Sequence, residues 1–175
     1  MEAGSSTLQD APTRRSPVVL ALERLFPQAL DNRYRGHVAA LWLLGLLVFV
    51  KAMISLVSLV DPAAGYKADG IPLGAYPPGA AHAVIGVGAY LDVELLMLVL
   101  VFIGALVRYR SAVPLMYLLL VVEFLAHKWA GLRFPIVRAG GGSQSIVTLV
   151  MFALMLVGLA LSLTGKGYSA LGKPK

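Results

Sequence analysis

Four long apolar runs constrain this chain more than any other feature. They lie at residues 37–60, 79–107, 112–131 and 145–164. Each run is long enough to cross about 30 Å of hydrocarbon as a helix, which takes about 20 residues. In lipid the backbone must satisfy its own hydrogen bonds, and a helix does so within one segment. The pattern therefore predicts an all-α integral membrane protein in which residues 36–165 form a four-helix bundle.

The composition argues against a water-soluble fold. The chain is 58% hydrophobic and 14% charged, whereas soluble domains carry about 25% charged residues. A soluble domain of 175 residues has too little interior to bury so much apolar surface. The absence of cysteine excludes disulfides, thiolate metal sites and iron–sulfur clusters. Most of the basic residues behind the net charge of +6 lie outside the apolar runs, where membrane topology explains them, so we expect no nucleic-acid partner.

The segments outside the runs differ in character. Residues 1–16 are polar and predict a disordered tail, and residues 166–175 form a basic tail. Residues 17–35 begin with apolar side chains on one helical face, which predicts a short interfacial amphipathic helix or, equally, a helix packed against the bundle. The connection at 61–78 is rich in Pro, Gly and Tyr and predicts an ordered but irregular lid.

Ser111 and Pro114 mark the start of the third run. Serine side chains commonly cap helix N-termini, and proline is tolerated in the first helical turn because its missing N–H has no partner there. We therefore expect Ser111 to cap this helix.

The basic residues are distributed unevenly around the runs. Ten Lys and Arg lie on the side of the N-terminal region, the second connection and the C-terminus, and four lie on the other side. The positive-inside rule therefore places both termini in the cytoplasm. On that side we expect contacts between anionic lipid head groups and Arg33, Arg35, Arg108 and Arg110.

The informative ionisable residues within the apolar runs are Lys51, Asp92, Glu94 and Glu123. A charge near the bilayer centre costs at least ~2.5 kcal/mol, so such groups normally face protein, water or each other. Counting about 1.5 Å per residue places all four near one level, which predicts an intramembrane polar cluster. Asp92 and Glu94 point about 200° apart on a helix. We expect one to pair with Lys51, and the other to face the third run or to be protonated.

Three roles fit this cluster: an ion pair that fixes helix register, a proton or ion relay, and a polar ligand-binding pocket.

Two histidines extend the pattern. Glu123 and His127 are four residues apart on one helical face, and His82 begins the second run on the same side. His82, His127 and Glu123 are thus a candidate ligand or metal set on the outer side. We expect a Glu–His hydrogen bond rather than a bound metal, because this spacing is common in helices.

The stretch from Leu91 to His127 carries a resemblance to a known family. It has an acidic residue in a leucine-rich helix, a glycine near the helix end, a short Arg-containing turn and a return helix. This arrangement resembles the DoxX-like small bacterial membrane proteins. The chain is also similar to uncharacterised bacterial four-span proteins with YRGH and PIVR segments, here Tyr34–His37 and Pro135–Arg138. The resemblance implies a location in the bacterial inner membrane. Some DoxX-like members are associated with quinone-linked oxidoreductases, but the resemblance implies no catalytic residue here.

The sequence contains no nucleophile–base pair and no strong metal signature, so we expect a protein that is not an enzyme. The first hypothesis is an accessory or scaffold subunit of a larger inner-membrane complex, with the lipid bilayer, other membrane subunits or a second copy as partners. The alternative is a four-helix protein that binds a small hydrophobic ligand (a quinone, lipid or pigment), with or without a redox role. Proton-coupled transport is a third hypothesis. No particular cofactor is predicted.

Overall fold

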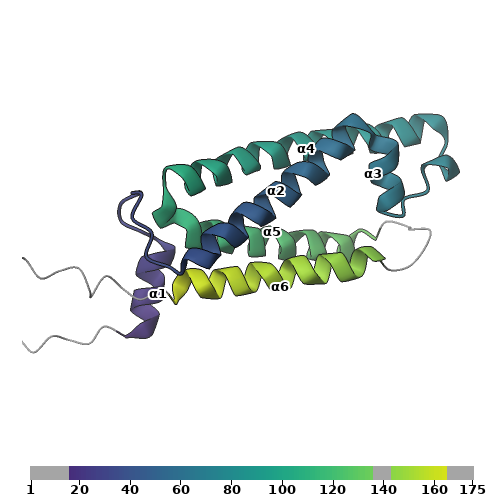
Figure 1. Cartoon of the computed structure of the whole chain (residues 1–175). Coiled ribbons are helices and arrows are strands. Elements are labelled where there is room, and N and C mark those ends of the chain that lie inside the picture. The colour runs from purple at the N-terminus through teal and green to yellow at the C-terminus, as the bar shows by residue number, and fades with distance from the viewer. Residues whose placement is uncertain (1–15, 136–142, 165–175) are drawn as a thin grey trace, which may run out of the picture.

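The computed structural model describes residues 16–135 and 143–164, which are helical and contain no strand. Four long helices run alternately up and down (Figure 1). They are α2 (Val38–Val60), α4 (Pro78–Val107), α5 (Val113–Arg133) and α6 (Ser143–Leu163). Each contains a segment long and apolar enough to cross a membrane. The prediction of an all-α, multi-pass membrane bundle is confirmed. Apart from Ser16, the predicted tails at 1–16 and 166–175 lie outside the described residues.

Short helices cover the two ends of the bundle. α1 (Pro17–Leu25) lies across one end, which we name the α1 end, and α3 (Pro62–Ala68) lies at the opposite, α3 end (Figure 1). Two single 3₁₀ turns, η1 (Leu73–Ala75) and η2 (Arg110–Ala112), complete the connections. α1 covers only the first half of the segment predicted at 17–35. It stops before Pro27 because proline removes a hydrogen-bond donor and clashes with the preceding turn.

The connection between α2 and α4 is ordered, as expected, but its first part is regular rather than irregular. Asp61 caps α3 by accepting the Ala64 N–H at 3.1 Å, and Pro62 occupies the first turn. The Tyr66 hydroxyl donates to the Val84 carbonyl of α4 at 2.8 Å. Gly88 leaves space for this hydroxyl, because a Cβ there would overlap it. The segment is thus held against the beginning of α4.

The prediction that Ser111 caps the third long helix is wrong. Ala112 occupies the cap position of α5, and no side chain bonds to the helix there. The Ser111 hydroxyl instead accepts the Asp31 N–H and donates to the Asp31 carbonyl, both at 2.9 Å. The hydroxyl thus bonds to both backbone groups of one residue, and the serine joins the segment before α2 to the turn before α5.

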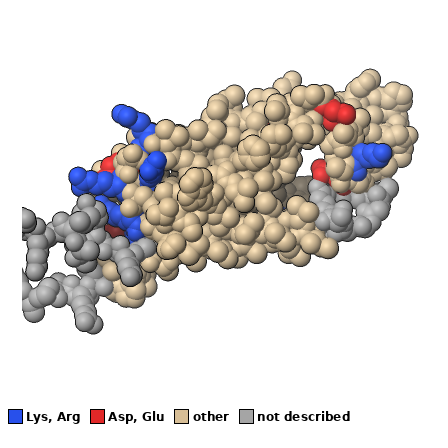
Figure 2. Space-filling model, in the orientation of Figure 1, with Lys and Arg blue, Asp and Glu red and all other residues tan. Residues whose placement is uncertain are grey.

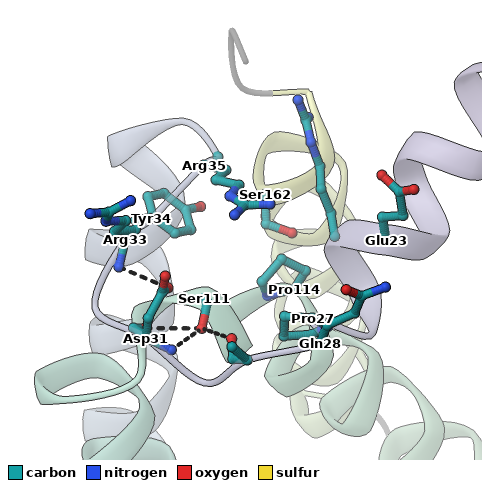
Figure 3. Close-up of a pocket in the computed structure, with 13 residues that line it drawn as sticks. Glu23, Pro27, Gln28, Asp31, Arg33, Tyr34, Arg35, Ser111, Pro114 and Ser162 are labelled. Atoms are coloured by element: carbon teal, nitrogen blue, oxygen red, sulfur yellow. Dashed lines mark hydrogen bonds between the residues drawn. The ribbon is translucent and has the colours of Figure 1, made fainter. Parts of the chain in front are cut away.

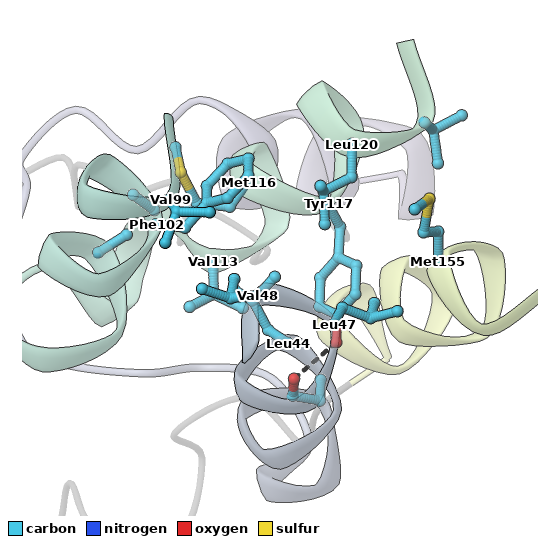
Figure 4. Packing of buried hydrophobic residues seen from close by; sticks show 14 residues of the cluster. Leu44, Leu47, Val48, Val99, Phe102, Val113, Met116, Tyr117, Leu120 and Met155 are labelled. Atoms are coloured by element: carbon cyan, nitrogen blue, oxygen red, sulfur yellow. Dashed lines mark hydrogen bonds between the residues drawn. The ribbon is translucent and has the colours of Figure 1, made fainter. Parts of the chain in front are cut away.

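The buried apolar residues of α2, α4 and α5 lie in the half of each helix nearer the α1 end. Figure 4 shows how they pack. The largest buried side chain of this hydrophobic core, Tyr117, donates its hydroxyl to the Ala40 carbonyl of α2 at 2.7 Å. Gly158 of α6 allows this ring to pass, because a Cβ there would overlap it. The buried apolar residues end at Val48 in α2 and at Val121 in α5. Beyond that level the helices enclose polar side chains.

α2 is the central helix of the bundle. It packs most extensively against α4 and also against α6, while α5 packs against α6. α4 and α5 touch much less, and α4 runs away from α5 and α6 toward the α3 end (Figure 1). The long helices therefore pack together near the α1 end and diverge toward the α3 end, which we name the open end. There the space-filling view shows a hollow in the surface (Figure 2).

Candidate ligand-binding site

Lys51 and Glu123 meet at the level where the hydrophobic core ends. Lys51 of α2 donates from Nζ to Oε1 of Glu123 on α5 at 2.7 Å. The two side chains are 15% and 17% exposed, so the protein covers most of both. Lys51 follows the buried Leu44 and Val48 by seven and three residues. It therefore lies on the same inward face of α2, and the helical period brings the charge into the bundle.

The partner of Lys51 differs from the one predicted. The sequence suggested Asp92 or Glu94, whereas the structure pairs Lys51 with Glu123. The similar depth of all four residues permits either pairing. The choice depends on which helices face each other at that depth, and this is a property of the tertiary packing.

Asp92 and Glu94 occupy different environments on α4. Asp92 precedes the buried Val99 by two helical turns and lies partly buried beside the Ser55 hydroxyl of α2. Ser55 is fully buried and its hydroxyl forms no hydrogen bond of standard geometry within the described segments. Glu94 points about 140° away from Val99 and is exposed. The predicted four-residue cluster is therefore wrong for Glu94, and its other members form two separate contacts.

Tyr66 of α3 belongs to the same polar region as Asp92. Burial raises the pKa of the Tyr66 phenol, and the Asp92 and Asp69 carboxylates raise it further. Both carboxylates repel a phenolate, so the phenol keeps its proton and remains a donor to Val84. The connection after α2 is thus tied both to α4 and to the polar side chains at the open end.

The histidines do not form the candidate metal set. His127 Nδ1 lies 4.0 Å from Glu123 Oε1, and the His127 side chain is 73% exposed. His82 is exposed near the beginning of α4. Across residues 16–135 and 143–164, no group of three His, Asp or Glu side chains is arranged to hold a metal ion. Glu123 and His127 thus lie on one face of α5, as their i, i+4 spacing predicts. The expected Glu–His hydrogen bond is not formed, because 4.0 Å is too long for one, and His82 does not join the pair.

A cavity of about 220 Å³ lies beside the Lys51–Glu123 pair, toward the α3 end. α2, α5 and α6 contribute its walls, formed by Lys51, Glu123, Phe124, His127, Lys128, Thr148 and Met155. The second carboxylate oxygen of Glu123, Oε2, is buried and has no hydrogen-bond partner in the part of the chain that the structure describes. Such a group is costly to leave unpaired. The site can therefore accept a hydrogen bond from a donor that enters the cavity.

Aromatic and thioether side chains form the apolar side of this cavity. Phe124 stacks on Phe152 of α6 with ring centroids 4.4 Å apart and planes inclined by 15°, and the Lys128 ammonium lies 5.7 Å from the Phe124 centroid. Met155 is almost fully buried. The cavity thus combines a charged pair on one side with aromatic and thioether surface on the other, as small-molecule sites commonly do.

Two residues of α6 in this cavity were not identified from the sequence. Thr148 and Met155 are seven residues apart, and the fully buried Ser162 follows by another seven. This repeat of two helical turns places all three on one face of α6. The seven-residue spacing is present in the sequence, but neutral side chains in an apolar run need no charged partner, so the spacing alone does not indicate a site.

The four arginines predicted to contact lipid lie at the α1 end. On the face visible in Figure 2, Lys and Arg side chains gather mainly at this end. Arg33 and Arg35 line a second cavity there, whereas Arg108 and Arg110 are exposed and do not line it. The structure thus divides the predicted set into two pairs.

Comparison with family models, curated proteins and solved structures found no match to this chain. The resemblance to DoxX-like proteins stays a prediction.

Proposed function

We propose that this membrane protein binds a small amphipathic ligand of the quinone or lipid class in the cavity beside Lys51 and Glu123. The observation that carries the proposal is the buried, unpaired Oε2 of Glu123 beside that cavity. Lys51 already donates to Oε1, so the carboxylate needs one more donor. A ligand with a hydroxyl group, such as a quinol, supplies it.

The size of the cavity defines which part of the ligand enters. Complete small-molecule sites enclose roughly 300–1,000 Å³, and this cavity encloses about 220 Å³. It therefore accommodates a polar head group, while an apolar tail extends along the exposed hydrophobic surfaces of the helices. Because α5 and α6 contribute its walls as well as α2, a head group there also bridges the helices at the open end.

Titration of the full-length protein in lipid nanodiscs with a short-tailed benzoquinol, followed by tryptophan fluorescence, tests this proposal. Glu123→Gln replaces the charged acceptor by a weaker, neutral one and Thr148→Val removes a hydroxyl, each with little change in volume. Glu94→Gln makes the same change as Glu123→Gln on the exposed face of α4. We expect each cavity variant to weaken binding by roughly tenfold, with Glu94→Gln unchanged. The oxidised quinone is expected to bind less tightly because it has no hydroxyl donor. Equal binding by Glu123→Gln and Glu94→Gln contradicts the proposal.

We further propose that the protein resides in a bacterial inner membrane with both termini in the cytoplasm. The excess of Lys and Arg on the α1 side supports this orientation. The chain has no cysteine, so single Asn32→Cys and Ala75→Cys variants report on opposite ends. Both positions are exposed. A membrane-impermeant thiol reagent applied to cells with a permeabilised outer membrane should label Ala75→Cys alone, and label Asn32→Cys only after lysis. The reverse pattern contradicts the orientation.

The accessory-subunit hypothesis remains a prediction from the sequence. Its test is purification from the native membrane in mild detergent, with identification of accompanying subunits by mass spectrometry. A stoichiometric partner supports that hypothesis, and a chain that purifies alone with a bound small molecule favours the ligand-binding role.

A further inference from the structure

A larger cavity, of about 410 Å³, lies at the α1 end (Figure 3). Its walls come from α1, the segment before α2, the beginning of α5 and the end of α6. Three arginines and two acids line it: Arg24, Arg33, Arg35, Glu23 and Asp31. The lining therefore has a positive balance, at a site where four separate parts of the chain meet.

Two of the lining charges are oriented by the backbone. The Asp31 carboxylate accepts the Arg33 N–H at 3.1 Å. The Arg24 guanidinium donates to the Leu163 carbonyl, one of the groups that the end of α6 leaves without a helical partner. These bonds hold both charges at the wall of the cavity.

Arg33 and Arg35 are the cations available to a ligand. Both are exposed, and neither makes an ion pair within residues 16–135 and 143–164. A guanidinium presents a planar fork of donors that matches a phosphate group, and both arginines line this cavity.

Tyr34, between these arginines, supplies a neutral donor. Its hydroxyl is buried and has no hydrogen-bond partner among the residues placed by the structure, and the residue lines the cavity. Burial raises the pKa of Tyr34 to about 12, against a smaller opposing effect of Arg24. The phenol therefore keeps its proton at neutral pH and can donate to an anionic oxygen.

We propose that this cavity binds the phosphate group of an anionic phospholipid, through Arg33, Arg35 and the Tyr34 hydroxyl. A lipid is favoured over free phosphate because α1, which forms one wall, exposes apolar side chains. Val18, Leu22 and Phe26 in and next to this helix are 66%, 52% and 59% exposed. Acyl chains can cover these side chains while the head group fills the cavity. The site is distinct from the Lys51–Glu123 cavity at the level where the core ends.

The test measures stabilisation of the purified full-length protein in detergent by added phosphatidylglycerol, with phosphatidylcholine as the neutral reference. Arg33→Gln/Arg35→Gln is compared with Arg108→Gln/Arg110→Gln, which removes the same charge at the same end of the molecule but outside the cavity. We expect the first double variant to lose affinity for phosphatidylglycerol by roughly tenfold or more, and the second by less than about threefold. Equal losses indicate general surface attraction and overturn the proposal.

Two further measurements complete the test. One variant separates a loss of lipid binding from a loss of folding, and one control distinguishes a lipid phosphate from free phosphate. Tyr34→Phe keeps the ring and should weaken phosphatidylglycerol binding several-fold, with an unchanged melting temperature in phosphatidylcholine. Unchanged affinity in Tyr34→Phe contradicts the assigned donor. Inorganic phosphate at millimolar concentration should not reproduce the stabilisation. If it does so fully, the ligand is the free anion and the lipid proposal fails.

Discussion

Nζ of Lys51 lies 2.7 Å from Oε1 of Glu123, one helical turn beyond the last buried apolar residue of α2. The pair closes the packed half of the bundle and also forms the wall of the cavity beyond it. The same ion pair therefore joins α2 to α5 next to the hydrophobic core and, in the proposed function, contacts the ligand in the cavity. Because a charge left alone in this mostly covered position loses its partner and much of its hydration, we expect the two residues to depend strongly on each other.

Removing one member of this pair should destabilise the protein more than removing both. Lys51→Met and Glu123→Leu each leave a single shielded charge, and each should lower the free energy of unfolding by about 2–3 kcal/mol. The double variant should lose less than the sum of the two single changes. A double-mutant cycle from thermal or denaturant unfolding in detergent measures this coupling. Additive effects would show that the two side chains act independently.

Gly158→Ala should destabilise the bundle because the new methyl group overlaps the Tyr117 ring. The expected loss is about 1–3 kcal/mol, the usual cost of overpacking a well-packed core. Gly104→Ala is the matched control, since a Cβ there meets nothing within 4 Å, and it should stay within about 0.5 kcal/mol of the parent. Melting temperatures in one detergent compare the two. Equal melting temperatures for Gly158→Ala and Gly104→Ala would contradict the contact between Gly158 and Tyr117.

Alkaline pH should reveal the burial of Tyr34. Its pKa rises from 10.0 to about 12 in the folded protein, so the native state holds this proton more tightly than the unfolded chain. The resulting stability is fully present below pH 10 and is lost as the pH rises toward 12. Tyr34→Phe should reduce the loss of stability between these two pH values. The measurement is chemical unfolding at several alkaline pH values, and parallel curves for both proteins would rule the effect out.

Ser111→Ala should loosen the segment before α2 without unfolding the bundle. The hydroxyl makes two hydrogen bonds to the backbone of Asp31, and their removal should cost about 1–2 kcal/mol locally. Hydrogen exchange followed by mass spectrometry should show faster exchange around Asp31, with exchange at the centre of α5 unaffected. Faster exchange throughout α5 would instead mean that Ser111 stabilises the helix itself.

The four spans were predictable because the length of an apolar run by itself determines whether that segment can cross a membrane as a helix. The predicted runs begin and end within two residues of the observed helices, as proline and the change to polar residues dictate. Ser111 shows where local rules fail. As a cap it satisfies sequence statistics, yet Asp31, 80 residues away, offers it both a donor and an acceptor.

The candidate site shows the same division. The sequence alone determined that Lys51, Asp92, Glu94 and Glu123 lie at similar depth and that Asp92 and Glu94 point in different directions, because rise per residue and helical periodicity set these properties. It could not determine that Lys51 pairs with Glu123, that Thr148 of α6 joins them, or that Arg33 and Arg35 share a cavity with Tyr34. These facts depend on which helices are neighbours and how far they diverge. That choice is made by the summed packing of side chains such as Tyr117 against Gly158, and no single segment encodes it.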